Sequence, residues 1–381
     1  MALSRPIRWA ILAYGFSIAA VAISGVTGLA TIPAPAKAKE ALRKYLSHGE
    51  KLTLNAVVTR KASYSSAEEL RYSLSQDDHG RRKMVVLQPL AMQGMVSVDD
   101  GDVLASFCPD SSRWYTMPSP RLDSRDAEYR LNLTQRNYRL AVEKNLTIAG
   151  RPATVVLAVP VAKQMPTRRI AVDSERDVLL RVEVIHPGGK RETLYDTKAI
   201  TFPRAVQGQA ISITRPKEAR AIAFEAPTPL SSSREAKRTC GFVPLIPQKI
   251  PYGFQVRSVE AAQNSGSRYV ALRLTDGMVM ATLYQWDRTE TSNPIGGPSG
   301  MDRTIGNVQL RLAGELSEQV RMQIMESLAN ELGKTFRPGR ELPPAGESLW
   351  PKRMPEFAVD VQNGTVTYEI QGSDSSSRNQ P

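Results

Sequence analysis

Runs in which apolar and polar residues alternate dominate the chain from about residue 52 onward. A period of two is typical of strands with one buried face, and clusters of Asp, Asn, Gly and Pro between the runs favour tight turns. In the first half of the chain the pattern predicts strands over 52–60, 70–76 and 83–88, a hairpin over 94–110, a short strand over 113–119, two strands over 138–161 and three over 167–202.

Two segments instead have the spacing of amphipathic helices. In 38–48 the apolar residues share one helical face, and 123–136 begins at Asp123 or Ser124 as the candidate N-cap. The regular strand–helix–strand alternation of parallel sheets is missing. The pattern therefore predicts an α+β fold in which a curved antiparallel sheet packs on helices, over residues 39–203.

Residues 204–245 are rich in Pro, Ser and charged side chains and are expected to be a linker. The alternation then resumes and predicts a smaller α+β domain over 246–335. Its expected elements are a strand over 254–262, a hairpin over 268–285 that turns at Thr275-Asp276-Gly277, a strand over 307–314, and a helix over 317–333 with Ser317 as N-cap and Gly333 as C-terminal stop. Residues 336–381 are expected to be a Pro-rich tail with a terminal hairpin at Asn363-Gly364.

Residues 1–38 have the pattern of an export signal. Arg5 and Arg8 precede an uncharged run from Trp9 to Ile32, and the small residues at 34–38 offer two A-x-A cleavage sites. The apolar run is also long enough to span a bilayer, so an uncleaved membrane anchor stays open beside a cleaved signal peptide. Both alternatives predict an exported protein, in the periplasm or at the extracytoplasmic face of the membrane.

The formal net charge of +12 narrows the expected partners. A basic exported protein is expected to meet anionic lipid, acidic envelope polymers or an acidic protein segment, and export argues against nucleic acid. The oligomeric state does not follow from the sequence.

Motifs for catalysis or cofactor binding are missing from the sequence, including the nucleophile elbow, the Walker loop, the dinucleotide fingerprint and zinc-ligand spacing. Acidic pairs occur in expected hairpin turns, where Asp is favoured for backbone reasons. We therefore expect a protein that is not an enzyme and holds no cofactor and no metal. The two cysteines, Cys108 and Cys240, either form a disulfide in an oxidising compartment or are two unrelated buried thiols.

Three phrases of the sequence resemble a known family. The stretch from Ile170-Ala171-Val172-Asp173 to Phe202 resembles the fold shared by the lipoprotein carriers LolA and LolB and the N-terminal domain of RseB/MucB. The phrase Ile250–Phe254, followed by Leu274–Gly277, resembles the start of the smaller second domain of RseB/MucB. The resemblance covers roughly residues 39–333, and the long 204–245 segment and the tail depart from it.

The resemblance implies a half-open, LolA-like barrel whose concave apolar face holds acyl chains or an envelope signal. RseB-type proteins hold the exported segment of a membrane-bound anti-sigma factor until envelope stress, signalled by a mislocalised lipid, releases it. The candidate groove residues are Val57, Val86, Met95, Val96, Trp114, Tyr115, Met117 and Leu157; each of them is also an ordinary core residue if its strand face points inward. Candidate basic surface residues for anionic head groups or an acidic segment are Arg81, Arg82, Lys83, Arg168 and Arg169; solvated turns are the alternative for these.

Two functions follow from the resemblance, and a third class stays open. The first is a regulatory binding protein of RseB/MucB type. The second is a LolA-like carrier of lipids or lipoproteins, which needs only the first domain, so the predicted domain over 246–335 favours the first. The third is an envelope hydrolase whose Asp, His and Ser come together only in three dimensions.

Overall fold

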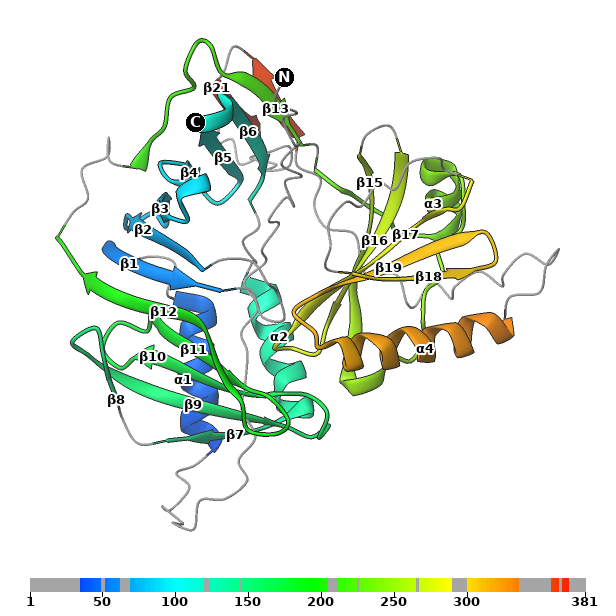
Figure 1. Cartoon of the computed structure of the whole chain (residues 1–381), viewed down its shortest axis with the longest axis horizontal. Helices are drawn as coiled ribbons and strands as arrows, with labels where there is room; N and C mark the ends of the chain where they lie inside the picture. Colours follow the sequence, from blue (N-terminus) through cyan, green and yellow to red (C-terminus); the bar gives the residue numbers. More distant parts are fainter. Residues whose placement is uncertain are drawn as a thin grey trace, which may run out of the picture.

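The chain folds around two large sheets, shown at the left and right of Figure 1. One sheet has 13 strands and the other has six, and a separate pair of strands forms a third, two-stranded sheet. The computed structural model describes residues 35–48, 52–61, 69–119, 124–143, 146–204, 211–224, 226–264, 267–289, 300–335, 358–362 and 365–369.

The 13-stranded sheet has its strands in the order β13-β6-β5-β4-β3-β2-β1-β12-β11-β10-β9-β7, with β8 paired to β9. Its neighbours are antiparallel, except that β13 runs parallel to β6. The strands at the two ends of this order do not pair with each other, so within the described residues the sheet is not closed. Its strands are β1 (Leu54–Arg60), β2 (Leu70–Gln76), β3 (Arg82–Gln88), β4 (Val96–Asp99), β5 (Val103–Cys108), β6 (Arg113–Pro118), β7 (Tyr138–Val142), β8 (Leu146–Ile148), β9 (Arg151–Pro160), β10 (Thr167–Asp173), β11 (Leu179–Ile185), β12 (Arg191–Thr201) and β13 (Arg220–Ala223).

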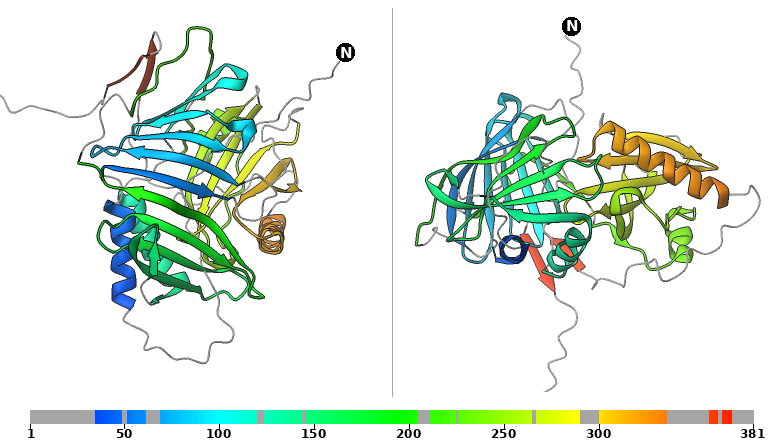
Figure 2. Two further views of the ribbon diagram at one scale, coloured as in Figure 1. Left: turned by 60° about the vertical axis from the view of Figure 1, so that its left-hand side comes forward. Right: turned by 90° about the horizontal axis from the view of Figure 1, so that it is seen from below.

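Helices α1 (Pro35–His48) and α2 (Ser124–Asn137) pack on each other and on β7, while α1 also contacts β9 and β10. Figure 2 shows α1 beside the lower, green strands, away from the upper, cyan strands of the same sheet. Leu42 and Leu131 of the helices lie in one core cluster with Ile170 of β10. The mixed α+β class and the large antiparallel sheet predicted from the alternation are confirmed.

The turns form where clusters of Asp and Gly predicted them. Asp77 follows β2 directly, and its Oδ1 accepts hydrogen bonds from the amides of His79 and Arg81, while Gly80 has the positive φ that the turn requires. In the β4–β5 turn the Asp99 carboxylate accepts the amide of Gly101 in the same way. At each turn the Asp carboxylate accepts backbone amides that have no strand partner there. This is why Asp marks turns in the sequence.

The six-stranded sheet has the order β14-β15-β16-β17-β19-β18. The side chain of Ser317 accepts the Val320 amide, which confirms the predicted N-cap of the last helix. That helix continues past Gly333, so the predicted stop is wrong by two residues. The elements of this region are β14 (Thr228–Pro229), α3 (Ser233–Cys240), the short 3-10 helix η4 (Pro251–Gly253), β15 (Gln255–Asn264), β16 (Ser267–Thr275), β17 (Met280–Asp287), β18 (Met301–Ile305), β19 (Val308–Gly314) and α4 (Glu318–Thr335).

Three segments differ from the sequence expectation or extend it. The expected linker over 204–245 contains β13, β14 and α3, whose N-cap Ser232 accepts the Glu235 amide. The terminal hairpin is confirmed as β20 (Ala358–Gln362) paired with β21 (Thr365–Glu369). The predicted signal or anchor lies almost wholly outside the described residues. Among the helices that are described, none combines the length and hydropathy needed to cross a bilayer.

Candidate functional site

The structure divides the predicted groove residues between the two faces of the sheet. Because directly paired residues of antiparallel strands share a face, the register can be followed across β1 to β6. Val86, Tyr115 and Met117 lie on one face, and Val57, Val96 and Trp114 lie on the other. Met95 precedes β4, where its carbonyl accepts the Val86 amide, and Leu157 packs with Ile185 elsewhere in the sheet.

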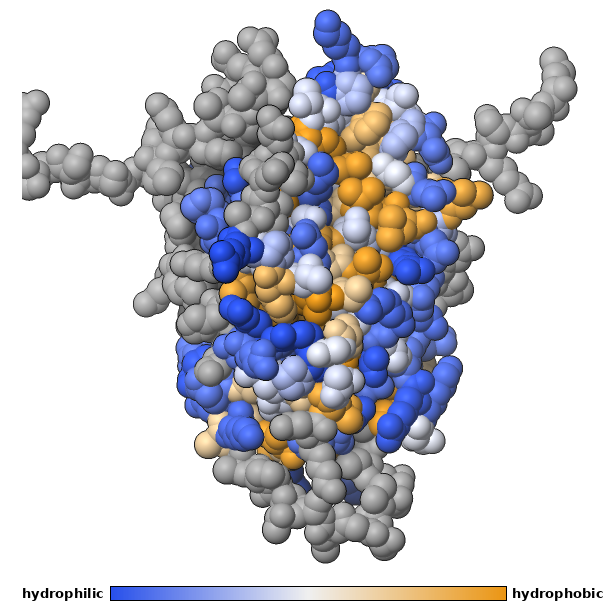
Figure 3. Space-filling model, turned by 90° about the vertical axis from the view of Figure 1, so that its left-hand side faces the viewer, coloured by the Kyte–Doolittle hydropathy of each residue, from blue (hydrophilic) through white to orange (hydrophobic). Residues whose placement is uncertain are grey.

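The first six strands nevertheless expose apolar side chains to solvent. Most residues of β3 and β6 are only partly buried, whereas β9 and β10 are largely buried. Figure 3 shows apolar side chains gathered in a band on one side of the molecule, with hydrophilic residues around them. The 3-10 helix η1 (Leu90–Met92) adds Leu90, which is 81% exposed. Together these strands and η1 form a candidate surface for an apolar ligand.

The predicted basic residues do not gather into one positive surface. Arg81 pairs with Asp77 at 2.6 Å, and Arg82 donates to the Gln76 side chain. Arg169 is held by two carboxylates, from Glu143 and Glu183, and Lys83 is half-buried. Two of these cations, Arg81 and Arg169, are therefore paired with carboxylates within the fold.

The burial of Arg168 contradicts the expected basic surface most clearly. Its side chain is 0% exposed, and none of its three guanidinium nitrogens has a hydrogen-bond partner in the described structure. Asp276 and Glu315, which come from the six-stranded sheet region, lie close enough to interact with it electrostatically. Arg168 thus belongs to the contact between the two sheets and not to a solvated turn.

Both cysteines are free and buried, so the structure does not contain the disulfide that the even count allowed. Cys108 ends β5 of the large sheet, opposite Arg113 of β6. Cys240 ends α3, and its thiol donates to the Tyr269 carbonyl within the other sheet region. Each thiol is packed into its own region. Burial raises the pKa of the Cys240 thiol, which makes that thiol less reactive.

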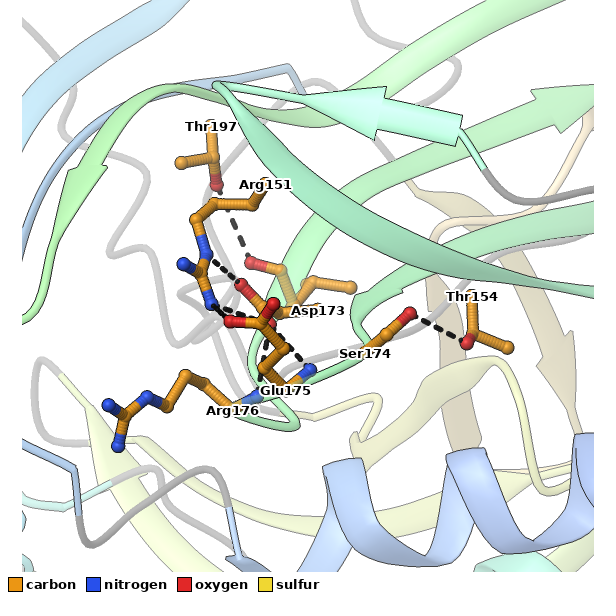
Figure 4. Close-up of polar contacts among 8 residues, drawn as sticks. Arg151, Thr154, Asp173, Ser174, Glu175, Arg176 and Thr197 are labelled. Atoms are coloured by element: carbon orange, nitrogen blue, oxygen red, sulfur yellow. Dashed lines mark hydrogen bonds and ion pairs between the residues drawn. The ribbon is translucent and has the colours of Figure 1, made fainter.

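The Asp173 turn explains the phrase that carries the resemblance in the first region. Figure 4 shows Arg151 directed at both Asp173 and Glu175, while Ser174 lies beside Thr154. The Asp173 carboxylate also accepts the amides of Glu175 and Arg176. Burial raises the pKa of Asp173, but the Arg151 guanidinium and the two amides outweigh burial and hold this pKa below its usual range. The motif is therefore a structural turn between β10 and β11.

The clearest built site is the contact between α2 and the turn from Asp276 to Met278. Arg130 Nε donates to the Gly277 carbonyl at 3.1 Å. The Asn137 side chain donates to the carbonyl of Asp276 at 2.8 Å. The Tyr138 hydroxyl donates to the Asp276 carboxylate at 2.6 Å. This set joins the large sheet region to the β16–β17 turn.

Two glycines let this contact form. A Cβ at Gly277 would lie 2.4 Å from the Thr134 amide nitrogen of α2, and one at Gly253 would lie 2.1 Å from Asn137 Oδ1. Both glycines also have positive φ, and Gly253 accepts a bond from Asn137 through its carbonyl. The backbone of both turns therefore approaches α2 more closely than any other residue would permit.

Sequence reasoning missed these interface residues, although a signal was present. The two phrases that resemble the start of a second domain, Ile250–Phe254 and Leu274–Gly277, each place one glycine against α2. A glycine within each phrase marks a close backbone approach, but the helix that it approaches is more than 100 residues away in the chain.

No protein-family model and no curated protein sequence matches the chain. Among solved structures, a crystal structure of MucB aligns with a TM-score of 0.50 and 12% identity, covering 77% of this chain and 97% of that one. A complex of MucA and MucB from Pseudomonas aeruginosa aligns with a TM-score of 0.52 at 11% identity, covering 76% and 96%. MucB in complex with MucA(peri) gives a TM-score of 0.51 at 11% identity, covering 75% and 96%. The chain therefore has an RseB/MucB-like fold, as the resemblance of its sequence phrases predicted.

Proposed function

We propose that this protein is an exported regulatory binding protein of RseB/MucB type, which holds the exported segment of a membrane-bound anti-sigma factor. The observation that carries the proposal is the agreement in fold over 96–97% of the MucB chains and 76–77% of this chain. Two of these structures contain MucA bound to MucB. A carrier with one domain would not need the six-stranded sheet.

The partly exposed apolar side chains of β1 to β6 support a second, finer part of the proposal. Side chains such as Tyr115 and Met117 lie on one face and are only partly buried, and Leu90 of η1 is exposed. In a half-open barrel such residues would line a groove for an acyl chain, and lipid bound there would control the hold on the anti-sigma segment.

The decisive experiment measures binding to the exported segment of an anti-sigma factor encoded in the same genome. Biolayer interferometry with the purified chain should give saturable binding, and the bound segment should resist a site-specific protease longer than the free segment. Met322→Asp, at a position that is 44% exposed on α4, serves as a surface control. No binding at micromolar concentrations to any such segment would overturn the proposal.

A LolA-like carrier of lipids or lipoproteins is the second candidate function. The apolar side chains exposed on the first six strands favour it, since a carrier needs such a surface and no protein partner. Native mass spectrometry with added lysophospholipid separates the two functions. Lipid binding without binding of any anti-sigma segment would support the carrier.

A further inference from the structure

The two sheet regions share one apolar core cluster, and the polar groups beside it fall into two unlike parts. On the α2 side, donors and acceptors meet: Tyr138, Asn137 and Arg130 bind the turn that begins at Asp276. Within that turn the Asp276 carboxylate also accepts the amides of Met278 and Val279 at 2.8 and 2.7 Å. This part satisfies its polar groups, so it favours the docked arrangement.

On the β10 side, the same contact buries charges without direct partners. Arg168 is fully enclosed with three unpartnered nitrogens, and Oε2 of Glu315 is buried without a partner. Removing such groups from water is unfavourable, and attraction at a distance offsets only part of that loss. Separation of the two regions would return Arg168 and Glu315 to water, so it would recover free energy at this side.

We propose that the Asp276–Met278 turn and α2 form a releasable latch, which holds the two sheet regions in one orientation against the opposing cost of the charges buried beside it. The hydrogen-bonded part supplies specificity, because it requires a glycine at 277. The charged part lowers the free energy needed to open. A purely apolar contact of the same size would lack both properties.

The latch concerns the orientation of two regions of this chain, so it stands whether or not the chain binds an anti-sigma segment. Release changes which surfaces near α2 and β10 face solvent, and any partner that binds one of those surfaces would shift the docked population. The proposal is tested by measuring the relative arrangement of the two regions in the purified chain, without a partner.

A matched pair of glycine variants isolates the docking contact. Gly277→Ala introduces a Cβ that would meet the Thr134 amide at 2.4 Å. Gly188→Ala carries nearly the same backbone strain, since φ is +102° at Gly188 and +101° at Gly277, but its Cβ would meet nothing within 4 Å. Any difference between the two variants therefore reports the contact with α2 and not the strain of a positive φ.

Small-angle X-ray scattering of the purified chain provides the readout. Gly277→Ala should broaden the distance distribution and raise the radius of gyration, while Gly188→Ala should match the parent chain. Circular dichroism confirms that each variant is folded. If both variants scatter like the parent, the turn is not a latch and the proposal is wrong.

A second pair covers the case in which Gly277→Ala fails to fold. Tyr138→Phe and Asn137→Ala remove donors to Asp276 and add no atoms, so each should shift the scattering in the same direction by a smaller amount. Asn132→Ala, on the exposed side of the same helix, is the control for these. Parent-like scattering from both Tyr138→Phe and Asn137→Ala would overturn the proposal.

Discussion

Two parts of the 13-stranded sheet share one architecture and differ in what packs on them. Strands β7, β9 and β10 receive α1 or α2, and nearly every residue of β10 is buried. Strands β1 to β6, the uncovered part, alternate in the same way and bury some apolar residues such as Val58 and Val86, but most apolar residues of β3, β4 and β6 are only partly buried. Alternation therefore predicts a strand in both parts, whereas burial depends on a helix that the strand's own sequence does not encode.

This difference separates stability from binding. A side chain enclosed by α1 or α2 contributes to the free energy of folding through the apolar area removed from water. A half-exposed side chain on β3 or β6 contributes less to folding and remains accessible to a ligand. Substitutions in the covered part should therefore lower stability most, and substitutions in the uncovered part should weaken ligand binding most.

The largest expected effect is at the centre of the covered part. Ile170→Ala deletes a fully buried side chain that shares a core cluster with Leu42 and Leu131, and should cost about 4 kcal/mol of unfolding free energy through lost burial and the cavity left behind. Val96→Ala in the uncovered part should cost about 1 kcal/mol or less. Urea unfolding measures both. Equal losses would show that the uncovered part is as tightly packed as the covered one.

The next effect concerns the turn that joins β10 to β11. Asp173→Asn removes a carboxylate that is 0% exposed and leaves the Arg151 guanidinium with one fewer anionic partner, so a loss of about 3 kcal/mol is expected. Because the pKa of Asp173 is depressed in the folded state, its contribution is present above the unfolded pKa and is lost as the pH falls through the folded pKa. Thermal melts between about pH 7 and pH 3 measure this contribution. In Asp173→Asn the melting temperature should fall less on acidification than in the parent, and an equal fall would contradict the role given to the Asp173 carboxylate.

Sequence patterns located most of the elements because their signals are local. Each of the turns at Asp77, Asp99 and Asp276 uses an Asp carboxylate that accepts nearby backbone amides, so the residue type and the turn have one cause. The sequence places β13 in a linker because a strand of four residues is too short to show a recognisable period. Its position depends on pairing with a strand about 100 residues earlier.

The candidate site was less predictable for a physical reason. Trp114 and Tyr115 are consecutive in β6, so they must point to opposite faces, and only the register shows which face each shares with Val86 or Val96. The sequence places Arg168 with Arg169 in a basic surface or a solvated turn, but the surface that buries Arg168 comes from a sheet remote in the chain. Contacts between distant regions leave only an indirect trace, such as the glycine at 277.

The docking of the two sheet regions should depend on pH, with an effect smaller than that of the Ile170 and Asp173 substitutions. Burial raises the pKa values of both Asp276 and Glu315 in the docked state. The docked state therefore binds protons more tightly, so docking is strongest in acid and weakens as the pH rises through these raised values. The titratable and charged groups that face these carboxyls are Tyr138, Arg168, Arg60 and Glu192.

Scattering curves recorded from about pH 8 down to about pH 5 measure the effect, and the radius of gyration should fall on acidification. Glu315→Gln removes one of the two titrating groups, and it should shrink the dependence and favour docking at the higher pH. A radius that rises in acid would mean that these carboxyls are stabilised as anions at the interface.

The substitution with the smallest effect on stability is expected at Leu90, where the effect on binding of an apolar ligand should be largest. Leu90→Asp changes a side chain that is 81% exposed on η1, so its unfolding free energy should stay within about 0.5 kcal/mol of the parent. If the uncovered part binds acyl chains, a charge placed beside the half-exposed strands should weaken binding of a fluorescent lysophospholipid severalfold. Met322→Asp on α4 should leave that binding unchanged, because it lies on the other sheet region. Equal lipid binding by both variants would show that lipid does not bind beside η1. The partly exposed strands would then be candidates for a protein contact, because no helix covers them as α1 covers β9 and β10.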